Sequence, residues 1–420
     1  MVDIQLIRTD SEKVKIGVQK KGYDVGIVDK VLELDEKRLE LLKKVEDLRK
    51  ERNELGELGA QRTKEDEERG KKIKEELKSL ETEMESATSE FNQVLQGIPS
   101  LPFDDVPEGK SESENKVLRT VGEPTKFDFE PLDHVELAKK LDIIDFEAGA
   151  KVAGSGFYYL KNDAVLLELA LVQYGLNFLA KKGFTPTITP DLAKEKYYLG
   201  TGYLPRGPEA QIYKAEGLDL GLIATAEVTL AGLHADETLN EKELPKKYGG
   251  YSHCFRMESG SYGKYSKGLY RVHQFTKVEM FVYSKPEGSQ EMHQELLGLE
   301  EEFWESLGIP YRVVEMCTGD LGAQAARKYD LEAWMPGRGD WGEVISASNT
   351  TDYQARNLNI KFKRGGRTEF VHTLNGTLVA TSRGIIAILE NYQQKDGTVK
   401  VPEILVSYVG KDKIGGESTK

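Results

Sequence analysis

The fold of this chain is decided by the sequence Cys254-Phe255-Arg256-Met257-Glu258, followed after a loop by Arg271-Val272-His273-Gln274-Phe275. Each of the two segments predicts a β-strand. The residues between them include Gly260-Ser261-Tyr262-Gly263, Lys264 and Lys267, which indicates a long loop that carries glycine and positive charge. The chain is therefore predicted to form two neighbouring strands joined by a cationic loop.

The two predicted strands place charged and aromatic side chains on one face of a sheet. Arg256 ends the first strand, and His273, Phe275 and Glu279 alternate along the second, so they should share a face. A guanidinium can fork onto a phosphate and a ring can stack on a base, so this face could hold a nucleotide. The alternative is a hairpin whose charged face is solvated, and the pattern taken alone favours that alternative.

Composition limits what the chain can be. Its 420 residues, 39% of them hydrophobic, can bury a sizeable core and predict more than one domain. Only two cysteines are present, Cys254 and Cys317, which argues against a disulfide framework and against a structural zinc site built on paired thiolates. The net charge is -13, so any polyanionic partner must meet a local basic patch.

No membrane or signal segment is expected. No apolar run approaches membrane-spanning length, and the start Met1-Val2-Asp3-Ile4 lacks a basic and then apolar signal. A cytoplasmic, reducing location is therefore expected. No glycine loop of the phosphate-binding kind precedes a helix, which argues against a Walker or Rossmann site.

Residues from about 24 to 96 carry a repeat that the rest of the chain lacks. Apolar residues recur with alternating spacings of three and four, the coiled-coil spacing, on either side of a break at Gly56, Gly59 and Gly70. The two seams are Val31, Leu34, Leu41, Val45, Leu48 and Leu55, and then Ile73, Leu77, Leu80, Met84, Ala87, Phe91 and Val94. This predicts an N-terminal domain over 1–98 whose residues 27–96, approximately, form an antiparallel two-helix arm.

The outer faces of the arm mix lysines and arginines with many glutamates. The basic residues are Lys43, Lys44, Arg49, Lys50, Arg52, Arg62, Lys71, Lys72, Lys74 and Lys78. Such charge is typical of a solvated coiled coil or an oligomerisation rod, and the arm alone favours that interpretation. The functional alternative is a basic stripe that contacts a nucleic-acid backbone.

The remainder of the chain is predicted to be an α+β domain. Residues 99–125, rich in proline, glycine and acidic residues, are expected to be a linker, and 126–420 a globular domain. Strands are predicted at 185–189, 221–224, 251–255, 269–283, 311–317, 341–346, 358–363 and 369–374, and helices at 163–182, 290–307 and 380–393. Runs of strands with few helices between them indicate a mostly antiparallel sheet flanked by helices.

An arginine lies in an unusual position near the C-terminus. Arg383 falls in the first turn of an apolar helix, after the segment His372-Thr373-Leu374-Asn375-Gly376, where its charge opposes the helix dipole. It could reach out to solvent, or it could form an anion site with the helix N-terminus. Further upstream, Gly183 to Pro190 joins a helix to a strand that ends in proline. This arrangement is common and alone is weak evidence of function.

The order of these segments is much more specific than any one of them. The relevant stretches are Leu141–Glu147, Thr225-Ala226-Glu227, Cys254-Phe255-Arg256, Gly268–Phe275, Cys317–Gly322, Tyr329-Asp330-Leu331-Glu332 and His372–Gly376. Together they resemble class II aminoacyl-tRNA synthetases, and within that class the seryl-tRNA synthetases. The resemblance covers nearly the whole chain, including the arm, and implies an antiparallel-sheet catalytic domain.

The resemblance also implies an activity. Seryl-tRNA synthetases activate L-serine with ATP to seryl-adenylate, and transfer the seryl group to the 3′ end of tRNA(Ser) and, where that pathway exists, tRNA(Sec). It further implies a homodimer, with Gly183 to Pro190 matching the dimer motif of the class. Two alternatives remain: a paralogue that loads an amino acid onto a carrier protein, and a catalytically inactive RNA-binding or structural protein.

For ATP, the resemblance implies a set of residues with distinct roles. Arg256 would hold the α-phosphate and the serine carboxylate, and Arg383 the γ-phosphate, which makes both catalytic. Glu258 would face the adenine, and Phe275 would stack on it. The complete expected set is Arg256, Met257, Glu258, Val272, His273, Gln274, Phe275, Glu343, Val344, Ile345, Ser346 and Arg383.

Mg²⁺ and serine have their own expected ligands. Glu343 and Ser346 would bind Mg²⁺, in keeping with its preference for few protein oxygens plus phosphates, and no zinc is expected. The serine pocket would comprise Thr225, Ala226, Glu227, Arg256, Glu279, Asn375 and Thr377. A pocket that hydrogen-bonds a hydroxyl rejects alanine.

The chain departs from the family pattern in one loop. Many relatives carry an Arg-Asp-Thr-Arg-like sequence where this chain has Lys264-Tyr265-Ser266-Lys267. The replacement affects the expected contacts with the tRNA acceptor stem and leaves the activation chemistry unaffected.

Overall fold

The computed structural model describes residues 1–203, 212–258 and 266–415. Its contacts divide the chain into two compact units, Met1–Leu101 and Pro102–Lys420. Residues 259–265 lie outside the described residues, and with them Lys264 and Tyr265 of the expected departure from the family.

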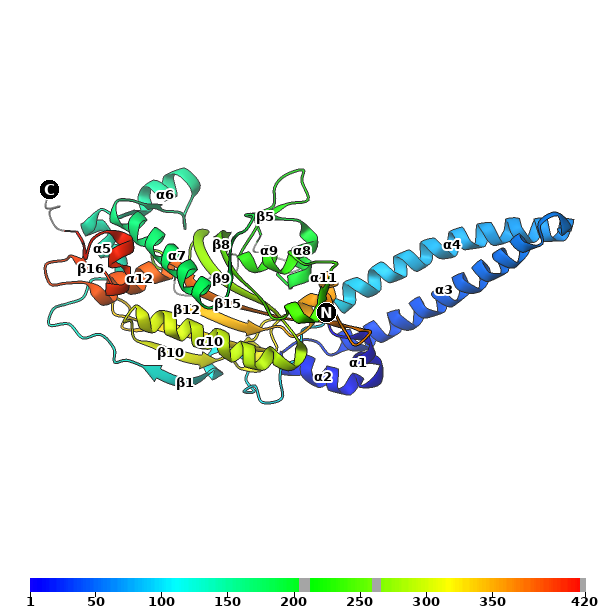
Figure 1. The fold of residues 1–420 in the computed structure, drawn as a ribbon, viewed down its shortest axis with the longest axis horizontal. Helices are drawn as coiled ribbons and strands as arrows, with labels where there is room; N and C mark the ends of the chain where they lie inside the picture. Colours follow the sequence, from blue (N-terminus) through cyan, green and yellow to red (C-terminus); the bar gives the residue numbers. More distant parts are fainter. Residues whose placement is uncertain (204–211, 259–265, 416–420) are drawn as a thin grey trace. The chain divides into compact units, whose positions relative to one another are not determined.

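The first unit contains a hairpin of two long helices. Helix α3 (Gly26–Glu57) and helix α4 (Lys64–Leu95) each have 32 residues and lie side by side (Figure 1). The predicted two-helix arm is thereby confirmed. The predicted break was too wide, because Gly56 and Gly70 lie inside the helices and only residues 58–63, which include the 3-10 turn Gly59–Gln61, separate them.

The start of α4 is set by local hydrogen bonds. Thr63 Oγ1 accepts from the Asp66 backbone N–H at 3.2 Å, and Asp66 Oδ2 accepts from the Thr63 backbone N–H at 2.8 Å. This reciprocal pair is a capping box, which satisfies two backbone donors that a helix leaves unpaired at its start. Thr63 and Asp66 therefore determine where α4 begins.

The predicted seams form the interior of the hairpin. Near the tip, Val45 packs with Ile73 and Leu77. At the base, seam residues form a separate core with helices α1 (Ile4–Thr9) and α2 (Ser11–Lys20). Its buried members are Val2, Ile7, Val14, Val18, Val28, Val31, Leu34, Phe91, Leu95 and Ile98.

The second unit is built on an eight-stranded sheet. In spatial order its strands are β1 (Lys116–Val121), β10 (Tyr311–Glu315), β11 (Arg327–Met335), β12 (Asp340–Asn349), β15 (His372–Ala380), β9 (Gln274–Ser284), β8 (Lys246–Phe255) and β4 (Thr185–Ile188). Every neighbouring pair is antiparallel except β4 and β8, which are parallel. The expected mostly antiparallel α+β architecture is confirmed.

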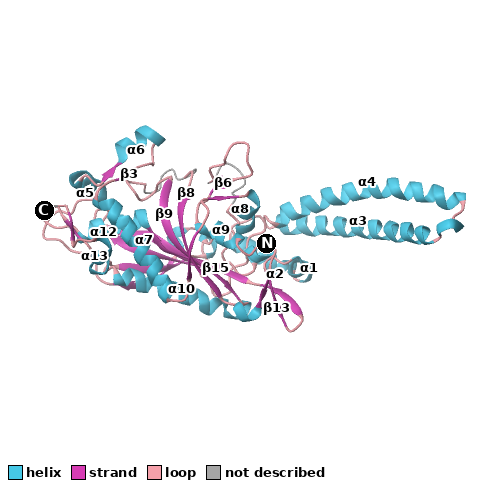
Figure 2. Cartoon of the chain, turned by 45° about the horizontal axis from the view of Figure 1, so that its top comes forward, coloured by secondary structure: helices cyan, strands magenta, loops and turns pink. Residues whose placement is uncertain are grey.

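Helices cover one face of this sheet and leave part of the other face for a cavity. Helices α7 (Asp163–Lys181) and α10 (Ser289–Ser306) lie on the same side (Figure 2). Every second residue of β9, including Val278 and Met280, joins their core. The alternate residues face the opposite side, where Phe281 packs with helix α9 (Ala226–Gly232) and helix α11 (Tyr353–Leu358).

Shorter elements complete the unit. The remaining helices are α5 (His134–Leu141), α6 (Phe146–Ala153), α8 (Glu195–Thr201), α12 (Thr381–Tyr392) and α13 (Glu403–Val409). The remaining strands are β2 (Ile144–Asp145), β3 (Tyr159–Leu160), β5 (Leu192–Ala193), β6 (Gly221–Leu222), β7 (Thr238–Asn240), β13 (Lys361–Arg364), β14 (Arg367–Phe370), β16 (Val399–Lys400) and β17 (Lys413–Ile414).

Four predicted segments differ from the structure. The strand expected over 369–374 is divided at Val371 between β14 and β15, which belong to different sheets. The strand expected over 269–283 begins only at Gln274, because the residues before it form turns. The segment 358–363 is divided by Asn359, whose left-handed backbone (φ 55°) ends α11 before β13 begins. Within the range expected to be a linker, Lys116–Val121 forms β1 and pairs with β10.

Helix α7 ends within one residue of the predicted range 163–182 and is strongly apolar. Among the described residues it is the one helix that meets the length and composition expected of a membrane span, with a mean hydropathy of 1.3. Half of that stretch is buried, against α12, α13 and the sheet. Core helices of globular proteins meet the same criterion.

Candidate active site

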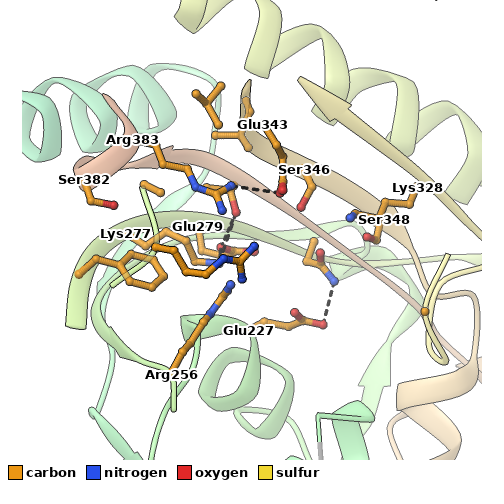
Figure 3. Close-up of a pocket in the computed structure, with 18 of the residues that line it drawn as sticks. Glu227, Arg256, Lys277, Glu279, Lys328, Glu343, Ser346, Ser348, Ser382 and Arg383 are labelled. Carbon is orange, nitrogen blue, oxygen red and sulfur yellow. Dashed lines mark hydrogen bonds and ion pairs between the residues drawn. The ribbon is translucent and has the colours of Figure 1, made fainter. Parts of the chain in front are cut away.

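A cavity of about 280 Å³ lies on the face of the sheet away from α7 and α10 (Figure 3). Strands β9, β11, β12 and β15, the start of α12 and the segment that follows β8 supply most of its walls. Most of the residues expected to form the site line this cavity. They are Glu227, Arg256, Glu258, Val272, Phe275, Glu279, Glu343, Val344, Ile345, Ser346, Asn375, Thr377 and Arg383. Segments more than 150 residues apart in sequence thus converge here.

Arg256 is fixed by its place at the end of β8. Its backbone N–H donates to the His273 carbonyl at 2.9 Å, and its Nε donates to the Ala224 carbonyl at 3.4 Å. The guanidinium carbon lies 5.2 Å from the centre of the Phe275 ring, within cation–π range. A cation and an aromatic face are therefore presented side by side.

Glu258 and Arg271 form an ion pair next to Arg256. Arg271 Nη1 lies 2.7 Å from Glu258 Oε2. Glu258 has a left-handed backbone (φ 50°), which is uncommon for a residue other than glycine. The two strands leading to and from the loop are therefore tied together by charge at their open end.

Arg383 enters the cavity from the first turn of α12. Its Nη1 lies 3.2 Å from Glu343 Oε1 on β12, and its Nε donates to the Tyr270 carbonyl at 3.4 Å. Burial would raise the pKa of Glu343, but the charge of Arg383, with those of Lys328 and Arg256, lowers it to about 2. The carboxylate is thus fully ionised at neutral pH.

Glu227 is a buried carboxyl that accepts two amide hydrogen bonds. Gln354 Nε2 donates to its Oε1 at 2.7 Å, and Asn375 Nδ2 donates at 2.8 Å. Thr225 caps α9 by accepting from the Glu227 backbone N–H at 3.2 Å. Burial, and then the nearby charge of Glu279, raise the pKa of Glu227 to about 7.

A second buried carboxylate lies on β9. Glu279 forms an ion pair with Lys277, two residues earlier on the same face. Thr377 Oγ1, from the paired strand β15, donates to Glu279 Oε2 at 3.2 Å, and Lys277 Nζ donates to Thr377 Oγ1 at 3.3 Å. The three side chains form a closed polar cluster that lines the cavity, and Figure 3 shows Lys277 beside Glu279.

A third group lies on β11 and β12. Lys328 Nζ is 3.0 Å from Asp330 Oδ1, and β11 pairs Lys328 with Ser348 and Asp330 with Ser346. Burial would lower the pKa of Lys328, but the charges of Asp330 and Glu343 raise it above its ordinary value. In Figure 3, Lys328 and Ser348 lie on the opposite side of the cavity from Lys277.

Not all expected site residues reach this cavity. Thr225 and Ala226 are fully buried beside it. Met257 is 40% exposed and does not line it. His273 precedes β9 and turns toward Phe157, on which it stacks with ring centres 5.1 Å apart.

Gln274, which was expected to bind ATP, instead lines a smaller neighbouring cavity that shares Phe275 with the main one. Lys277 and Lys328 line the main cavity and were not predicted. Lys277 could have been predicted to line the site, because alternation along β9 places it on the same face as Phe275 and Glu279. Lys328 could not, since β11 itself was not predicted.

His253 and His372 each hydrogen-bond to a neighbouring side chain, and both cysteines are buried. His253 Nδ1 lies 2.8 Å from Asp191 Oδ2, and His372 Nδ1 lies 2.8 Å from Ser289 Oγ. Cys254 and Cys317 are free and buried. Among the described residues, no group of three His, Cys, Asp or Glu side chains is arranged to hold a metal ion.

Comparison with known proteins decides the family. A serine–tRNA ligase of Rubrobacter xylanophilus is 52% identical to this chain in an alignment of 423 positions. The alignment covers 99% of each protein. The chain belongs to the seryl-tRNA synthetase family. Two family models agree with this: the seryl-tRNA synthetase N-terminal domain matches residues 1–102, and the class II tRNA synthetase core domain (G, H, P, S and T) matches residues 212–392.

Solved members of the seryl-tRNA synthetase family share the whole fold. The crystal structure of seryl-tRNA synthetase from Pyrococcus horikoshii complexed with ATP is 43% identical, with a TM-score of 0.91 and complete coverage of both chains. The cytoplasmic serine–tRNA ligase of Naegleria fowleri in complex with AMP is 38% identical, with a TM-score of 0.86. Both units of this chain therefore have counterparts within the family.

Proposed function

We propose that this chain is a serine–tRNA ligase, which forms seryl-adenylate from L-serine and ATP and then transfers the seryl group to the 3′ end of tRNA(Ser). The proposal extends to tRNA(Sec) as a second acceptor. One observation carries it: a single cavity holds two arginines, Arg256 and Arg383, beside a separate cluster of buried carboxyl, amide and hydroxyl groups. The first group suits phosphates, and the second suits a small amino acid.

The activation step needs positioning and positive charge. A carboxylate oxygen of serine attacks the α-phosphorus of ATP, an oxygen–phosphorus bond forms, and the bond to the leaving pyrophosphate breaks. Arg256 contacts the serine carboxylate and the α-phosphate, and so stabilises charge that grows in the transition state. Arg383 binds the γ-phosphate. No covalent enzyme intermediate is needed.

The adenine end of ATP is assigned to the open end of β8 and β9. Phe275 stacks on the base, and Glu258 lies at its edge. Val272, Val344 and Ile345 supply apolar contacts around the nucleotide. Met257, His273 and Gln274, which do not line the main cavity, act by supporting this segment.

Glu343 and Ser346 fit a magnesium site for the ATP phosphates. The lowered pKa of Glu343, about 2, keeps a carboxylate available, and Ser346 offers a hydroxyl on the same wall. Mg²⁺ prefers a few protein oxygens together with substrate phosphates. When bound, the ion neutralises phosphate charge.

The serine subsite is assigned to the polar cluster that lines the cavity. Glu279 receives the ammonium group and Glu227 completes the wall, while Thr225 supports Glu227 by capping α9 beside the cavity. Asn375 and Thr377 contact the side-chain hydroxyl. Alanine is rejected because it would leave these buried polar groups without a partner.

The two-helix arm is assigned to tRNA, through shape and backbone contacts. Its lysines and arginines are exposed, as phosphate binding requires. Four arginines already have partners within the hairpin: Arg49 pairs with Glu81 at 2.8 Å, Arg69 with Glu51 at 2.6 Å and Arg38 with Asp35 at 2.8 Å, and Arg62 Nε donates to the Leu55 carbonyl at 2.6 Å. The other basic side chains are the candidates for RNA contact.

A homodimer in the cytoplasm completes the proposal. Helix α7 and β4 expose large apolar side chains, among them Leu169 (57% exposed) and Ile188 (78% exposed), which a second copy would cover. Leu169→Asp is expected to shift the protein to a monomer in sedimentation velocity. A variant that sediments as the wild type at micromolar concentration would contradict the dimer face.

The experiment that tests the activity is acylation of tRNA(Ser) with radiolabelled serine and ATP. Serine-dependent charging that is lost when the tRNA 3′ end is oxidised supports the proposal. Loading of a carrier protein instead would support a carrier-protein ligase. Absence of any serine transfer would support an inactive RNA-binding paralogue.

A further inference from the structure

A buried histidine outside the cavity joins separate segments of the second unit. His134 begins α5 and is fully buried, and Glu390, near the end of α12, is almost so. Glu390 Oε1 accepts from the His134 backbone N–H at 3.0 Å and lies 2.8 Å from His134 Nδ1. Glu390 Oε2 accepts at 2.9 Å from the N–H of Gly337, in the turn between β11 and β12. Helices α5 and α12, which lie side by side in Figure 1, are thereby tied together.

The other nitrogen of the imidazole holds the backbone that leads toward β9. The Leu269 N–H donates to His134 Nε2 at 3.3 Å. Because a backbone N–H can only donate, Nε2 accepts, and the ring proton lies on Nδ1, from which it is donated to Glu390. A Cβ atom at Gly268 would lie only 2.2 Å from Nε2. The backbone at 268–269 therefore rests directly on the ring, and glycine permits that approach.

A charge contact anchors the same segment a second time. Lys267 forms an ion pair with Asp133, the residue before His134. Asp133 Oδ1 also caps α5 by accepting from the backbone N–H groups of Val135 and Glu136. Residues 267–269 are therefore held at the start of α5 by both an ion pair and a backbone hydrogen bond.

The next residue along the chain, Tyr270, belongs to the candidate active site. It lines the cavity, and its carbonyl accepts from Arg383 Nε at 3.4 Å. Its ring centre lies 4.8 Å from the Arg383 guanidinium carbon. Arg383 and Glu390 are seven residues apart on α12, which is about two turns, so both lie on one side of the helix. A closed ring of contacts therefore runs from Glu390 through the imidazole and the 269–270 backbone to Arg383.

We propose that His134 is a positioning residue for ATP: by accepting from the Leu269 N–H, it holds Tyr270 against the Arg383 guanidinium. The inference rests on the proposed function, in which Arg383 binds the γ-phosphate. When the phosphate chain inserts between Arg383 and Glu343, the Tyr270 carbonyl and ring remain to orient the guanidinium. His134 itself lies outside the cavity and acts through this backbone.

Two substitutions at His134 separate its two hydrogen bonds. In His134→Gln the amide oxygen can reach the place of Nε2 and still accept from Leu269, whereas His134→Asn can replace only the Nδ1 donor. In serine-dependent pyrophosphate exchange, His134→Asn should raise the KM for ATP on the order of tenfold. The KM for serine should stay within about twofold, and His134→Gln should keep both constants near wild type. An unchanged KM for ATP in His134→Asn, or an equal rise in both variants, would overturn the proposal.

The KM values distinguish positioning from loss of folded enzyme, because neither constant depends on how much of the enzyme is active. Gly268→Ala disturbs the same contact from the backbone side, where its Cβ would meet the imidazole. It should raise the KM for ATP as His134→Asn does, and it decides the question if His134→Asn fails to fold. A normal KM for ATP in Gly268→Ala would contradict the contact.

A double-mutant cycle tests the path through Arg383. In the Arg383→Ala background, His134→Asn should change the KM for ATP by less than about twofold, because the group that it positions is gone. An undiminished tenfold rise in that background would overturn the path. Failure of the wild-type enzyme to exchange pyrophosphate with serine would instead refute the proposed function itself.

Asn391→Ala provides the matched control. Asn391 follows Glu390 on α12, and its Nδ2 donates to the Trp334 and Ala387 carbonyls at 2.8 Å each. Its removal disturbs the same turn of the helix without touching the imidazole. The KM for ATP should stay within about twofold of wild type. A tenfold rise would mean that any disturbance at the end of α12 weakens ATP binding, and it would contradict the assignment to His134.

Discussion

The Arg383 guanidinium lies 3.2 Å from the Glu343 carboxylate and joins the start of α12 to β12 across the cavity. The pair explains why an arginine is tolerated beside the positive end of a helix: the carboxylate opposite offsets its charge. It also keeps Glu343 ionised, with a pKa of about 2. A phosphate chain with its metal ion can insert between these two groups and satisfy both.

Arg383→Ala should reduce serine-dependent pyrophosphate exchange. The change removes charge that the proposed transition state needs and leaves Glu343 without its closest cation, so kcat should fall on the order of a hundredfold or more. Steady-state exchange at saturating serine and ATP measures it.

Arg338→Ala is the control for Arg383→Ala. The Arg338 guanidinium carbon lies 5.9 Å from the centre of the Tyr270 ring, on which Arg383 also rests at 4.8 Å, but Arg338 does not line the cavity. Its removal should change exchange by less than about threefold. Near-normal exchange in Arg383→Ala would reject the assigned phosphate contact.

Glu227→Gln should change how stability depends on pH. The pKa of Glu227 is raised from 4.5 to about 7 by burial and by Glu279. The folded protein therefore holds this proton more tightly than the unfolded chain, and the associated stability is fully present below pH 4.5 and is lost as pH rises through 7.

The amide of Glu227→Gln has no proton to lose. Relative to wild type, the variant should therefore become more stable between pH 5 and pH 8, by on the order of 1–3 kcal/mol. Thermal unfolding of the full chain at both pH values measures the difference. A difference in melting temperature that does not vary with pH would contradict the raised pKa.

Thr377→Val should weaken serine use selectively. The substitution keeps the shape of the side chain but removes the hydroxyl that donates to Glu279 at 3.2 Å. The KM for serine in pyrophosphate exchange should rise about tenfold. The KM for ATP serves as the internal control, and an equal rise in both constants would indicate general damage to the cavity.

Neutralising arm lysines should weaken tRNA binding. In the variant carrying Lys71→Gln, Lys72→Gln, Lys74→Gln and Lys78→Gln, the slope of log affinity against log salt concentration should fall by about one for each lost phosphate contact. A variant with Glu75→Gln, Glu83→Gln, Glu85→Gln and Glu90→Gln on the same helix should bind as well as wild type or better. Unchanged affinity and slope in the lysine variant would reject the arm as the RNA-binding surface.

Much of the fold was readable from periodicity. The seams of α3 and α4 and the helices near 163–182, 290–307 and 380–393 follow from spacing, because buried faces repeat at fixed intervals. Boundaries were less readable. The second strand was extended back to 269, but turns hold the chain until Gln274, and no local signal marks that point.

The residues of the site could be predicted only where they belong to a sequence motif or to a predicted strand. Alternation along β9 correctly grouped Phe275 with Glu279, but His273 lies before the strand and turns away. Lys328 was missed because β11 was not predicted as a strand, although Tyr329–Glu332 was among the family stretches, and its place depends on pairing with β12. Register between distant strands is a tertiary property that one sequence does not display.

The most direct test of the account is pyrophosphate exchange with each of the twenty amino acids in turn. The account predicts ATP- and Mg²⁺-dependent exchange with serine. It predicts a rate for alanine lower by on the order of a thousandfold or more, because alanine leaves the groups around Glu279 unpaired. Exchange driven by a different amino acid, or none with serine, would contradict it.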